Sequence, residues 1–419
     1  MDVPDTIQLM GDKQWQEIKS RLTGKFNKMM KGLFRQKGAQ LDINILASDE
    51  AQEFITTHAG ILDGGFQKVE MSDKMRERLT RSNYIFSGIK TFHELNEAFP
   101  SMLDENGNKK PFERFLNDVR KINDTYNANY LHAEYNFVQA SATMAAKWEQ
   151  FSEDGDRYYL QYRTAKDDKV RPEHAALDGV TLPMSDSFWE TYYPPNGWNC
   201  RCTVVQVRKQ KYPATEHGEA MSRGEEAMNG ERYNIFRFNS GKQGKTMPDY
   251  NPYTIKRCSD CDVAKGKLKL GFVPDYQLCQ GCIMIRKCSE DRNRDNSAKA
   301  TKKSPEVKKL QGTTISNPDF NHEVLVTGGS IREWTNQPHK EYAAKNSILK
   351  HIAKVFREAK YIGFIDNFKK KPGVKQSHLF ETNVLGELSW IIVREYEIGE
   401  FVLHSISDSD KIKTGIRKE

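Results

Sequence analysis

Four cysteines form two pairs of identical spacing, Cys258-x-x-Cys261 and Cys279-x-x-Cys282, with seventeen residues between the pairs. Each pair bends the chain so that both sulfurs face one ion, and two pairs supply the four thiolates of a tetrahedral zinc site. A redox dithiol is the alternative, but it favours a βαβ context that the surrounding sequence lacks. We therefore predict a zinc-ribbon-like module over residues 256–290, in which structural Zn²⁺ supplies folding energy.

A second concentration of uncommon residue types lies in the stretch YRTAKDDKVRPEHAALDGVTLPMSDSFWETYYPPNGWNCRC, which begins at Tyr162 and ends at Cys202. It places His174 in the same stretch as Cys200 and Cys202, and a Pro-Pro-Asn-Gly-Trp turn precedes the two cysteines. Three interpretations stay open for the His and the two Cys: a metal site completed by Asp168 or Asp178, a reactive thiol, or packing residues in a loop-rich fold. Cys-x-Cys is a poor chelate spacing, so we favour packing.

This stretch resembles the signature of the phage Mu F-like minor head proteins, the head-morphogenesis family of tailed phages and prophages. The resemblance covers about residues 115–207 and implies a role in the capsid interior or at the portal, without catalysis. We also expect Gly197 to take positive φ in the turn. Arg163, Arg171, Asp168 and Asp178 are expected to form a buried charged network that holds the loops.

Composition limits the remaining possibilities. The chain has 419 residues, 37 % hydrophobic and 29 % charged, which indicates several globular domains. It contains no apolar run near twenty residues and no signal peptide, so we expect no membrane partner. All seven cysteines lie between Cys200 and Cys288, which argues against a disulfide scaffold. The net charge of +7 equals the excess in residues 256–310, where 14 Lys and Arg stand against 7 Asp and Glu.

The N-terminal third shows apolar residues at helical spacing, for example over 15–34 and 51–59. Between Pro111 and Gly155 the same spacing predicts one or two long helices that lead into the signature. We interpret this part as a helical scaffold that docks on other subunits. Residues 291–310, charged and almost free of large apolar residues, are predicted to be a linker.

The last hundred residues predict an α+β domain. A helix is expected within 331–360, with Pro338 in its first turn and a buried stripe that includes Ile352 and Phe356. Strands are expected at 361–365, 390–394 and 401–406, in an antiparallel sheet of three or four strands. The segments WTNQPHKEYAAKN, SHLFETN, SWIIVRE and LHSISDSD resemble the phage-encoded branch of the barnase–EndoU–colicin–RelE superfamily of RNases.

The resemblance implies RNA cleavage by 2′-hydroxyl attack, without a metal cofactor. Such chemistry needs a base, an acid and groups that stabilise the phosphate. His339 and His378 are the candidate base and acid. Arg394 and Lys345 are the candidate cations, and Ser405 or Ser407 is the candidate hydroxyl donor.

The predicted fold class is thus multidomain α+β. The expected domains are a helical N-terminal region (1–114), a loop-rich Mu F-like domain (115–255), the zinc module (256–290), the charged linker (291–312) and the nuclease-like domain (313–419). We expect portal and capsid subunits and RNA as partners, and also phage DNA at the basic segment 256–310. The expected locations are the virion and the bacterial host cytoplasm. The alternative is a purely structural minor head protein with an inactive, nucleic-acid-binding C-terminal domain.

Overall fold

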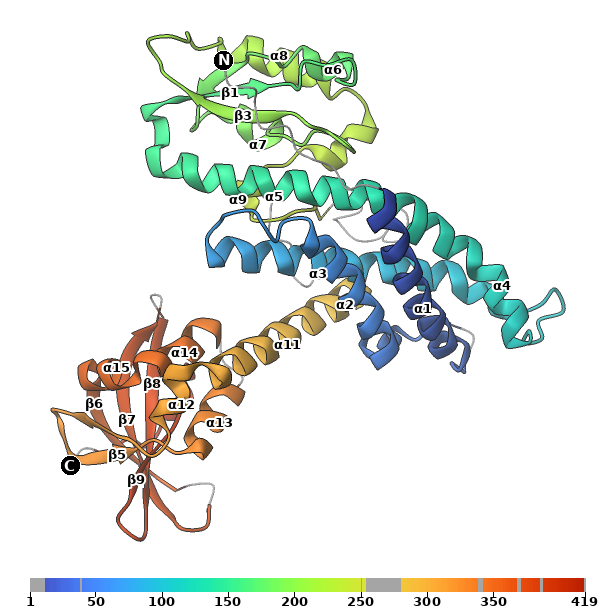
Figure 1. Ribbon diagram of the computed structural model, residues 1–419. Helices are drawn as coiled ribbons and strands as arrows, with labels where there is room; N and C mark the ends of the chain where they lie inside the picture. The colour runs from blue at the N-terminus through green and yellow to red at the C-terminus, as the bar shows by residue number, and fades with distance from the viewer. Residues whose placement is uncertain are drawn as a thin grey trace. The chain divides into compact units, whose positions relative to one another are not determined.

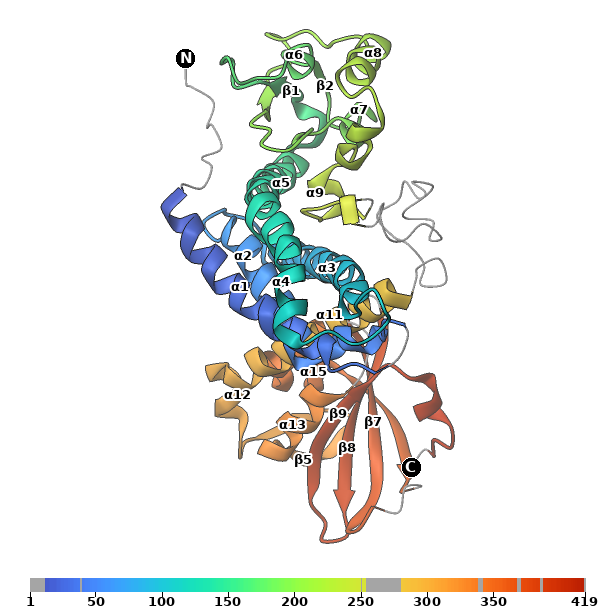
Figure 2. The same cartoon turned by 90° about the vertical axis from the view of Figure 1, so that its right-hand side faces the viewer.

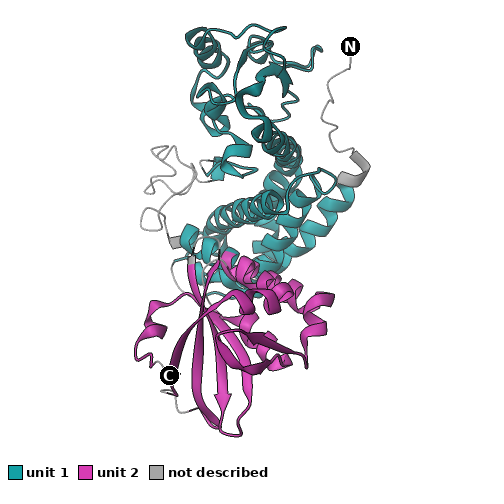
Figure 3. Cartoon of the chain, turned by 90° about the vertical axis from the view of Figure 1, so that its left-hand side faces the viewer, with its two compact units in different colours: residues 1–289 teal, residues 290–419 magenta. Residues whose placement is uncertain are grey.

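The computed structural model describes residues 12–37, 40–249, 251–253, 280–337, 342–367, 371–384 and 387–417. The chain divides into two compact units, residues 1–289 and 290–419 (Figure 3). The first contains the helical region and the loop-rich block, and the second contains a large sheet with its helices (Figure 1). None of the described helices is long and apolar enough to cross a membrane.

Five helices form the N-terminal part of unit 1. They are α1 (Asp12–Phe34), α2 (Asp49–Gly64), α3 (Asp73–Ala98), α4 (Phe112–Asn123) and α5 (Leu131–Asp154). Serine side chains cap two of them: Ser48 accepts from the Ala51 amide at the start of α2, and Ser72 accepts from the Met75 amide at the start of α3. A π-helical turn joins α4 to α5. The predicted helical character of this region is confirmed, including the one or two long helices expected before the signature.

The loop-rich block follows α5 and lies on one side of that helix (Figure 1). Its sheet has the order β2-β1-β3, all antiparallel, from β1 (Tyr159–Arg163), β2 (Thr181–Pro183) and β3 (Thr203–Val207). Short helices lie between and after the strands: α6 (Pro172–Ala175), α7 (Phe188–Thr191), α8 (His217–Ala227) and α9 (Ser240–Gln243). Loops form much of this block, as predicted.

Residues 291–312 were predicted to be a linker without regular structure, and this is wrong. Most of this stretch is helical, in α11 (Gln280–Lys303) and α12 (Pro305–Leu310), and the boundary between the two units falls within α11. The buried residues here are mostly small, such as Ala298 and Thr301, with Val307 fully buried in the core of unit 2. A helix that packs through small residues shows little apolar periodicity, and this is why the pattern suggested a linker.

Unit 2 is built on a six-stranded mixed sheet of order β4-β5-β9-β8-β7-β6, in which only β5 and β9 pair in parallel (Figure 2). The strands are β4 (Thr314–Asn317), β5 (Phe320–Leu325), β6 (Lys360–Asp366), β7 (Val374–Val384), β8 (Glu387–Tyr396) and β9 (Phe401–Ser407). Three helices stand between β5 and β6, namely α13 (Gly328–Asn336), α14 (Tyr342–Ile348) and α15 (Ile352–Glu358). Side chains from α13 and α15, including Trp334 and Phe356, form one core with Phe380 and Ile391 of the sheet.

The α+β class and the three predicted strands of this unit are confirmed, as is the buried stripe of Ile352 and Phe356. The expected sheet of three or four antiparallel strands is too small, because β4, β5 and β7 were not anticipated. The single helix predicted within 331–360 is divided: α13 ends at Asn336 and α14 begins at Tyr342. Pro338 lies outside the described residues.

Candidate functional site

The signature block is attached to α5 by hydrogen bonds between polar side chains. Lys147 Nζ donates to Thr203 Oγ1 at 2.8 Å, and Asn136 Nδ2 donates to Asn199 Oδ1 at 3.0 Å. Both acceptors lie in the segment that carries the Cys-x-Cys motif. The helix therefore fixes the position of that segment from two points along its length.

The Pro-Pro-Asn-Gly-Trp turn is held from inside the block. Tyr162 Oη in β1 donates to Asn196 Oδ1 at 2.8 Å, and both side chains are fully buried. Arg171 Nη2 donates to the Trp198 carbonyl at 2.6 Å. The expected positive φ at Gly197 is wrong, since Asn199 takes the left-handed conformation instead, with φ 56°. A Cβ at 197 would lie 2.9 Å from Arg171 Nη1, so a larger residue there would require the end of the Arg171 side chain to shift.

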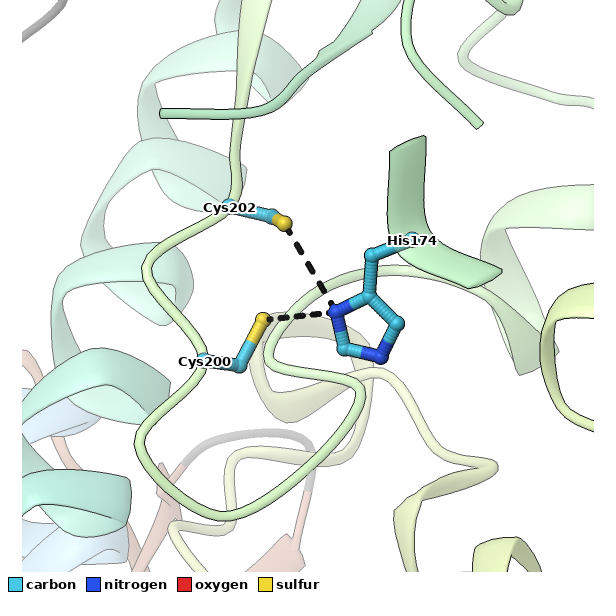
Figure 4. A group of neighbouring side chains, drawn as sticks. All are labelled: His174, Cys200 and Cys202. Atoms are coloured by element: carbon cyan, nitrogen blue, oxygen red, sulfur yellow. Dashed lines mark hydrogen bonds between the residues drawn. The ribbon is translucent and has the colours of Figure 1, made fainter. Parts of the chain in front are cut away.

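His174, Cys200 and Cys202 meet in a buried group (Figure 4). His174 lies in α6, and both cysteines lie in the segment that leads into β3. The His174 Nδ1 atom is 3.6 Å from Cys200 Sγ and 3.8 Å from Cys202 Sγ. The three side chains are between 2 % and 4 % exposed. The sequence placed these residues in one stretch, and the structure brings their ligand atoms together.

The two thiols of this group do not titrate independently. The pKa of the Cys200 thiol lies well below its ordinary value, mainly because of a hydrogen bond from Cys202. Burial acts in the opposite direction, and the neighbouring His174 lowers the pKa further. The pKa of Cys202 is raised, first by its hydrogen bond with Cys200 and then by burial. Two charges so close in a buried site repel each other, so the first deprotonation opposes the second. The pKa values of the two thiols are therefore shifted in opposite directions.

The predicted charged network of Arg163, Arg171, Asp168 and Asp178 is wrong as a single network. Arg171 binds a backbone carbonyl, and Asp178 Oδ1 accepts from the Thr164 amide and hydroxyl. Asp168 is exposed. The preceding residue, Asp167, accepts two hydrogen bonds of 2.6 Å from the guanidinium of Arg201. Backbone groups in the loops compete for these side chains, and the sequence does not show which partner is preferred.

In unit 2, His378 of β7 is buried between two polar partners. Its Nε2 atom lies 3.0 Å from Glu395 Oε2, and its Nδ1 atom lies 2.9 Å from Tyr361 Oη. Burial alone would raise the pKa of Glu395, but hydrogen bonds from Lys375, His378 and Gln376 hold that pKa below its ordinary value. The ring of His378 also packs against Phe320, with 4.9 Å between ring centroids.

The other predicted catalytic residues are not gathered around His378. His378 pairs with Val393 on β8, and both side chains face the helix-covered core. Arg394 follows Val393 and so points to the opposite face, since side chains alternate along a strand. Ser405 pairs with Ile392 and therefore shares the face of Arg394. The structure thus separates His378 from Arg394 and Ser405.

Lys345 binds Asp408, whereas Ser407 shares the face of Arg394 and Ser405 because it pairs with Trp390. Lys345 is fully buried in α14, and its Nζ atom is 2.9 Å from Asp408 Oδ2, just beyond the end of β9. Ser407 pairs with Trp390 of β8, whereas His378 pairs with Val393 of the same strand. Trp390 and Val393 are three residues apart, which is about 10 Å along the strand. His339 lies outside the described residues.

Three of the four predicted zinc ligands, Cys258, Cys261 and Cys279, lie outside the described residues. Cys282 lies in α11, is 5 % exposed and belongs to the core of unit 1. The four-thiolate zinc site stays a prediction.

A buried ionic group in the helical region was not anticipated from the sequence. Lys90 Nζ of α3 donates to Glu134 Oε2 of α5 at 2.7 Å and lies 3.1 Å from His58 Nε2 of α2. Tyr253 Oη donates to the other oxygen of Glu134. Burial and the nearby Lys90 lower the pKa of His58 to about 4. A partial signal was available at Glu134, which lies one turn from the apolar residues Leu131, Phe137 and Val138 of α5.

Two family models match the chain. Residues 106–205 match "Phage Mu protein F like protein", and residues 293–403 match "Large polyvalent protein-associated domain 3". The first match confirms the Mu F-like resemblance for the block described above. The second covers most of unit 2, and its description names no nuclease, so the RNase resemblance stays a prediction.

Two curated proteins are similar to the chain. "Putative capsid assembly protein F" of Escherichia phage Mu is 29 % identical over 283 residues, which cover 62 % of this chain and 61 % of that protein. "Mu-like prophage FluMu F protein" of Haemophilus influenzae is 31 % identical over 198 residues, 46 % of this chain and 42 % of that protein. The chain therefore spans less than two thirds of the length of each relative. No solved structure matches the chain.

Proposed function

We propose that this chain acts in head assembly of a tailed phage or prophage, as a minor head protein that docks on portal or capsid subunits. The observation that carries the proposal is the Mu F-like match over residues 106–205, together with similarity to a capsid assembly protein over 283 residues. We place the protein in the virion, with the host cytoplasm as the compartment where assembly takes place.

The geometry of the block supports a role as a rigid docking element. Its loops are fixed to α5 by Lys147 and Asn136 and to β1 by Tyr162. Trp198 packs edge-to-face against Phe137 of α5, with 5.2 Å between ring centroids. A loop surface that is fixed in this way loses little conformational entropy when it binds a partner.

Complementation tests this proposal. A phage that encodes the chain but carries a stop codon in its gene is supplied with the wild-type protein or with Trp198→Ala. The wild-type protein should restore filled heads and be present in them, and Trp198→Ala should reduce both. Normal heads in the absence of any copy of the protein would refute an assembly role.

A second proposal is endoribonuclease activity in unit 2, so that the chain would carry an RNase effector. It is supported by His378, held between Glu395 and Tyr361 as an acid–base residue requires. The burial of His378 and its separation from Arg394 and Ser405 favour the alternative, an inactive unit that binds nucleic acid. RNA incubated with the full chain in EDTA distinguishes them: cleavage to 2′,3′-cyclic phosphate ends, lost in His378→Ala, supports the enzyme, and intact RNA supports the alternative.

The zinc module is retained as a third proposal, supported by the spacing of Cys258, Cys261, Cys279 and Cys282. Together with the basic charge of 256–310, it provides a candidate contact for phage DNA. Such a contact predicts DNA affinity that falls steeply with salt and survives the substitution of His378.

A further inference from the structure

We propose that His174, Cys200 and Cys202 bind one thiophilic divalent cation, with Zn²⁺ as the first candidate. Zinc bonds are about 2.3 Å to sulfur and about 2.0–2.1 Å to nitrogen, so tetrahedral angles place a bound nitrogen and sulfur about 3.6 Å apart. The distances from His174 Nδ1 to the two sulfurs are 3.6 and 3.8 Å. All three ligand atoms lie within 4.8 Å of one another. The two nitrogen–sulfur separations thus match those expected around one zinc ion.

The state of the histidine ring supports the same conclusion. Among the described residues, His174 Nε2 is buried and has no hydrogen-bond partner. A buried donor without a partner costs about 1–3 kcal/mol, and contacts from Nδ1 to thiols, which are weak donors, offset little of that. A metal–nitrogen bond at Nδ1 would leave Nε2 as it is, but it would replace the two weak thiol contacts of the ring with a strong bond.

The structure also defines the protein ligands of the ion. No carboxylate joins the group among the described residues: Asp178 is bound to Thr164, and Asp168 is exposed. The site therefore offers two thiolates and one imidazole, a donor set that selects zinc over magnesium or calcium. A water molecule would complete four-coordination.

Such an ion would be structural. It would join α6 to the segment that leads into β3, and that segment includes the Asn199 contact to α5. Cys-x-Cys spacing is a weak signal in the sequence because the third donor lies twenty-six residues away from Cys200.

The test measures metal in the full chain by inductively coupled plasma mass spectrometry after purification under reducing conditions. The predicted zinc module is first removed with Cys258→Ser/Cys261→Ser, so that its cation does not contribute. We expect one equivalent of zinc in this double variant and none after Cys200→Ser is added. The matched control is Cys288→Ser in the same background, which removes a thiol outside both groups and should retain the equivalent.

A second measurement covers the case in which Cys200→Ser does not fold. Cobalt substituted into the double variant should give thiolate-to-cobalt charge-transfer absorption, which His174→Cys should increase because it adds a third thiolate. Absence of metal from the folded double variant would overturn the proposal, as would equal zinc with and without Cys200→Ser. A disulfide between Cys200 and Cys202 that survives purification under reducing conditions would also overturn the proposal.

Discussion

Unit 1 and unit 2 differ in how they use ionisable residues from separate segments. In unit 1, Lys90 and Glu134 come from different helices and form one buried pair, and His174 meets two cysteines across a loop. In unit 2, His378 and Arg394 lie on adjacent strands but on opposite faces of the sheet. Of the residue groups considered from the sequence, only His174, Cys200 and Cys202 come together, and they lie in unit 1.

The difference follows from the geometry of the two regions. In the signature block, turns and short helices allow a side chain to reach partners in several directions. In a sheet, each side chain is restricted to one face, and a shift of one residue in register reverses that face. Catalytic residues on three different strands therefore share one face only if the register of every strand pair places them there.

Among the substitutions that test this comparison, Lys90→Met in the helical part of unit 1 is expected to cause the largest loss of stability. The substitution leaves the buried Glu134 carboxylate without its cation, which costs about 3–5 kcal/mol. Hydrogen exchange of α3 and α5 peptides at increasing urea would measure the loss. The matched control is Lys90→Met/Glu134→Leu, which removes both charges and should recover most of the stability. An equal loss in the single and double variants would show that packing, not charge pairing, stabilises the group.

In unit 2, His378→Ala is expected to have a smaller effect, about 2–3 kcal/mol. It leaves Glu395 and Tyr361 without a shared partner and opens space beside Phe320. Faster exchange of β7 amides, residues 374–384, would report the change. Unchanged exchange in β7 would mean that His378 is not part of the core, and that its surroundings are open enough for substrate.

The pH dependence of unit 1 should depend on Glu94. Burial raises the pKa of this carboxyl to about 8. The folded chain therefore keeps the Glu94 proton up to about pH 8, whereas the unfolded chain releases it near pH 4.5. The tighter proton binding stabilises the folded chain fully below pH 4.5, and this stabilisation is lost as the pH rises through about 8. Between pH 6.5 and 8 the free energy of unfolding should fall by about 2 kcal/mol from this group.

Glu94→Gln removes this proton linkage. Urea unfolding at several pH values should give a flatter profile for the variant than for the wild-type protein over that range. Identical slopes in the two proteins would contradict the raised pKa.

Arg394→Ala is expected to have the smallest effect, within about 0.5 kcal/mol, because Arg394 is only half-buried and lies on the face away from the core. If RNA is cleaved at all, cleavage should also be unaffected, since Arg394 cannot reach His378 through the sheet. The assay is RNA cleavage in EDTA by the full chain. Strong loss of cleavage in Arg394→Ala would mean that the active site lies on that outer face instead.

Much of the fold was predictable from local signals. The helices α1, α2, α4 and α5 follow from apolar spacing, and β6, β8 and β9 follow from short apolar runs. The strand β7 was missed because Val374–Val384 mixes polar and apolar residues without clean alternation. Without β7 the register of its neighbours, and thus the face of His378, could not be derived. The Lys90–Glu134 pair was missed because it depends on how three helices pack.

The central claim is that head assembly depends on the Mu F-like block and not on His378 of unit 2. The most direct measurement is the yield of filled heads from a phage whose only copy of this protein is Trp198→Ala or His378→Ala. We predict that heads decrease strongly with Trp198→Ala and stay near wild-type number with His378→Ala. Normal head yield with a folded Trp198→Ala protein, and loss of heads with His378→Ala, would contradict the account.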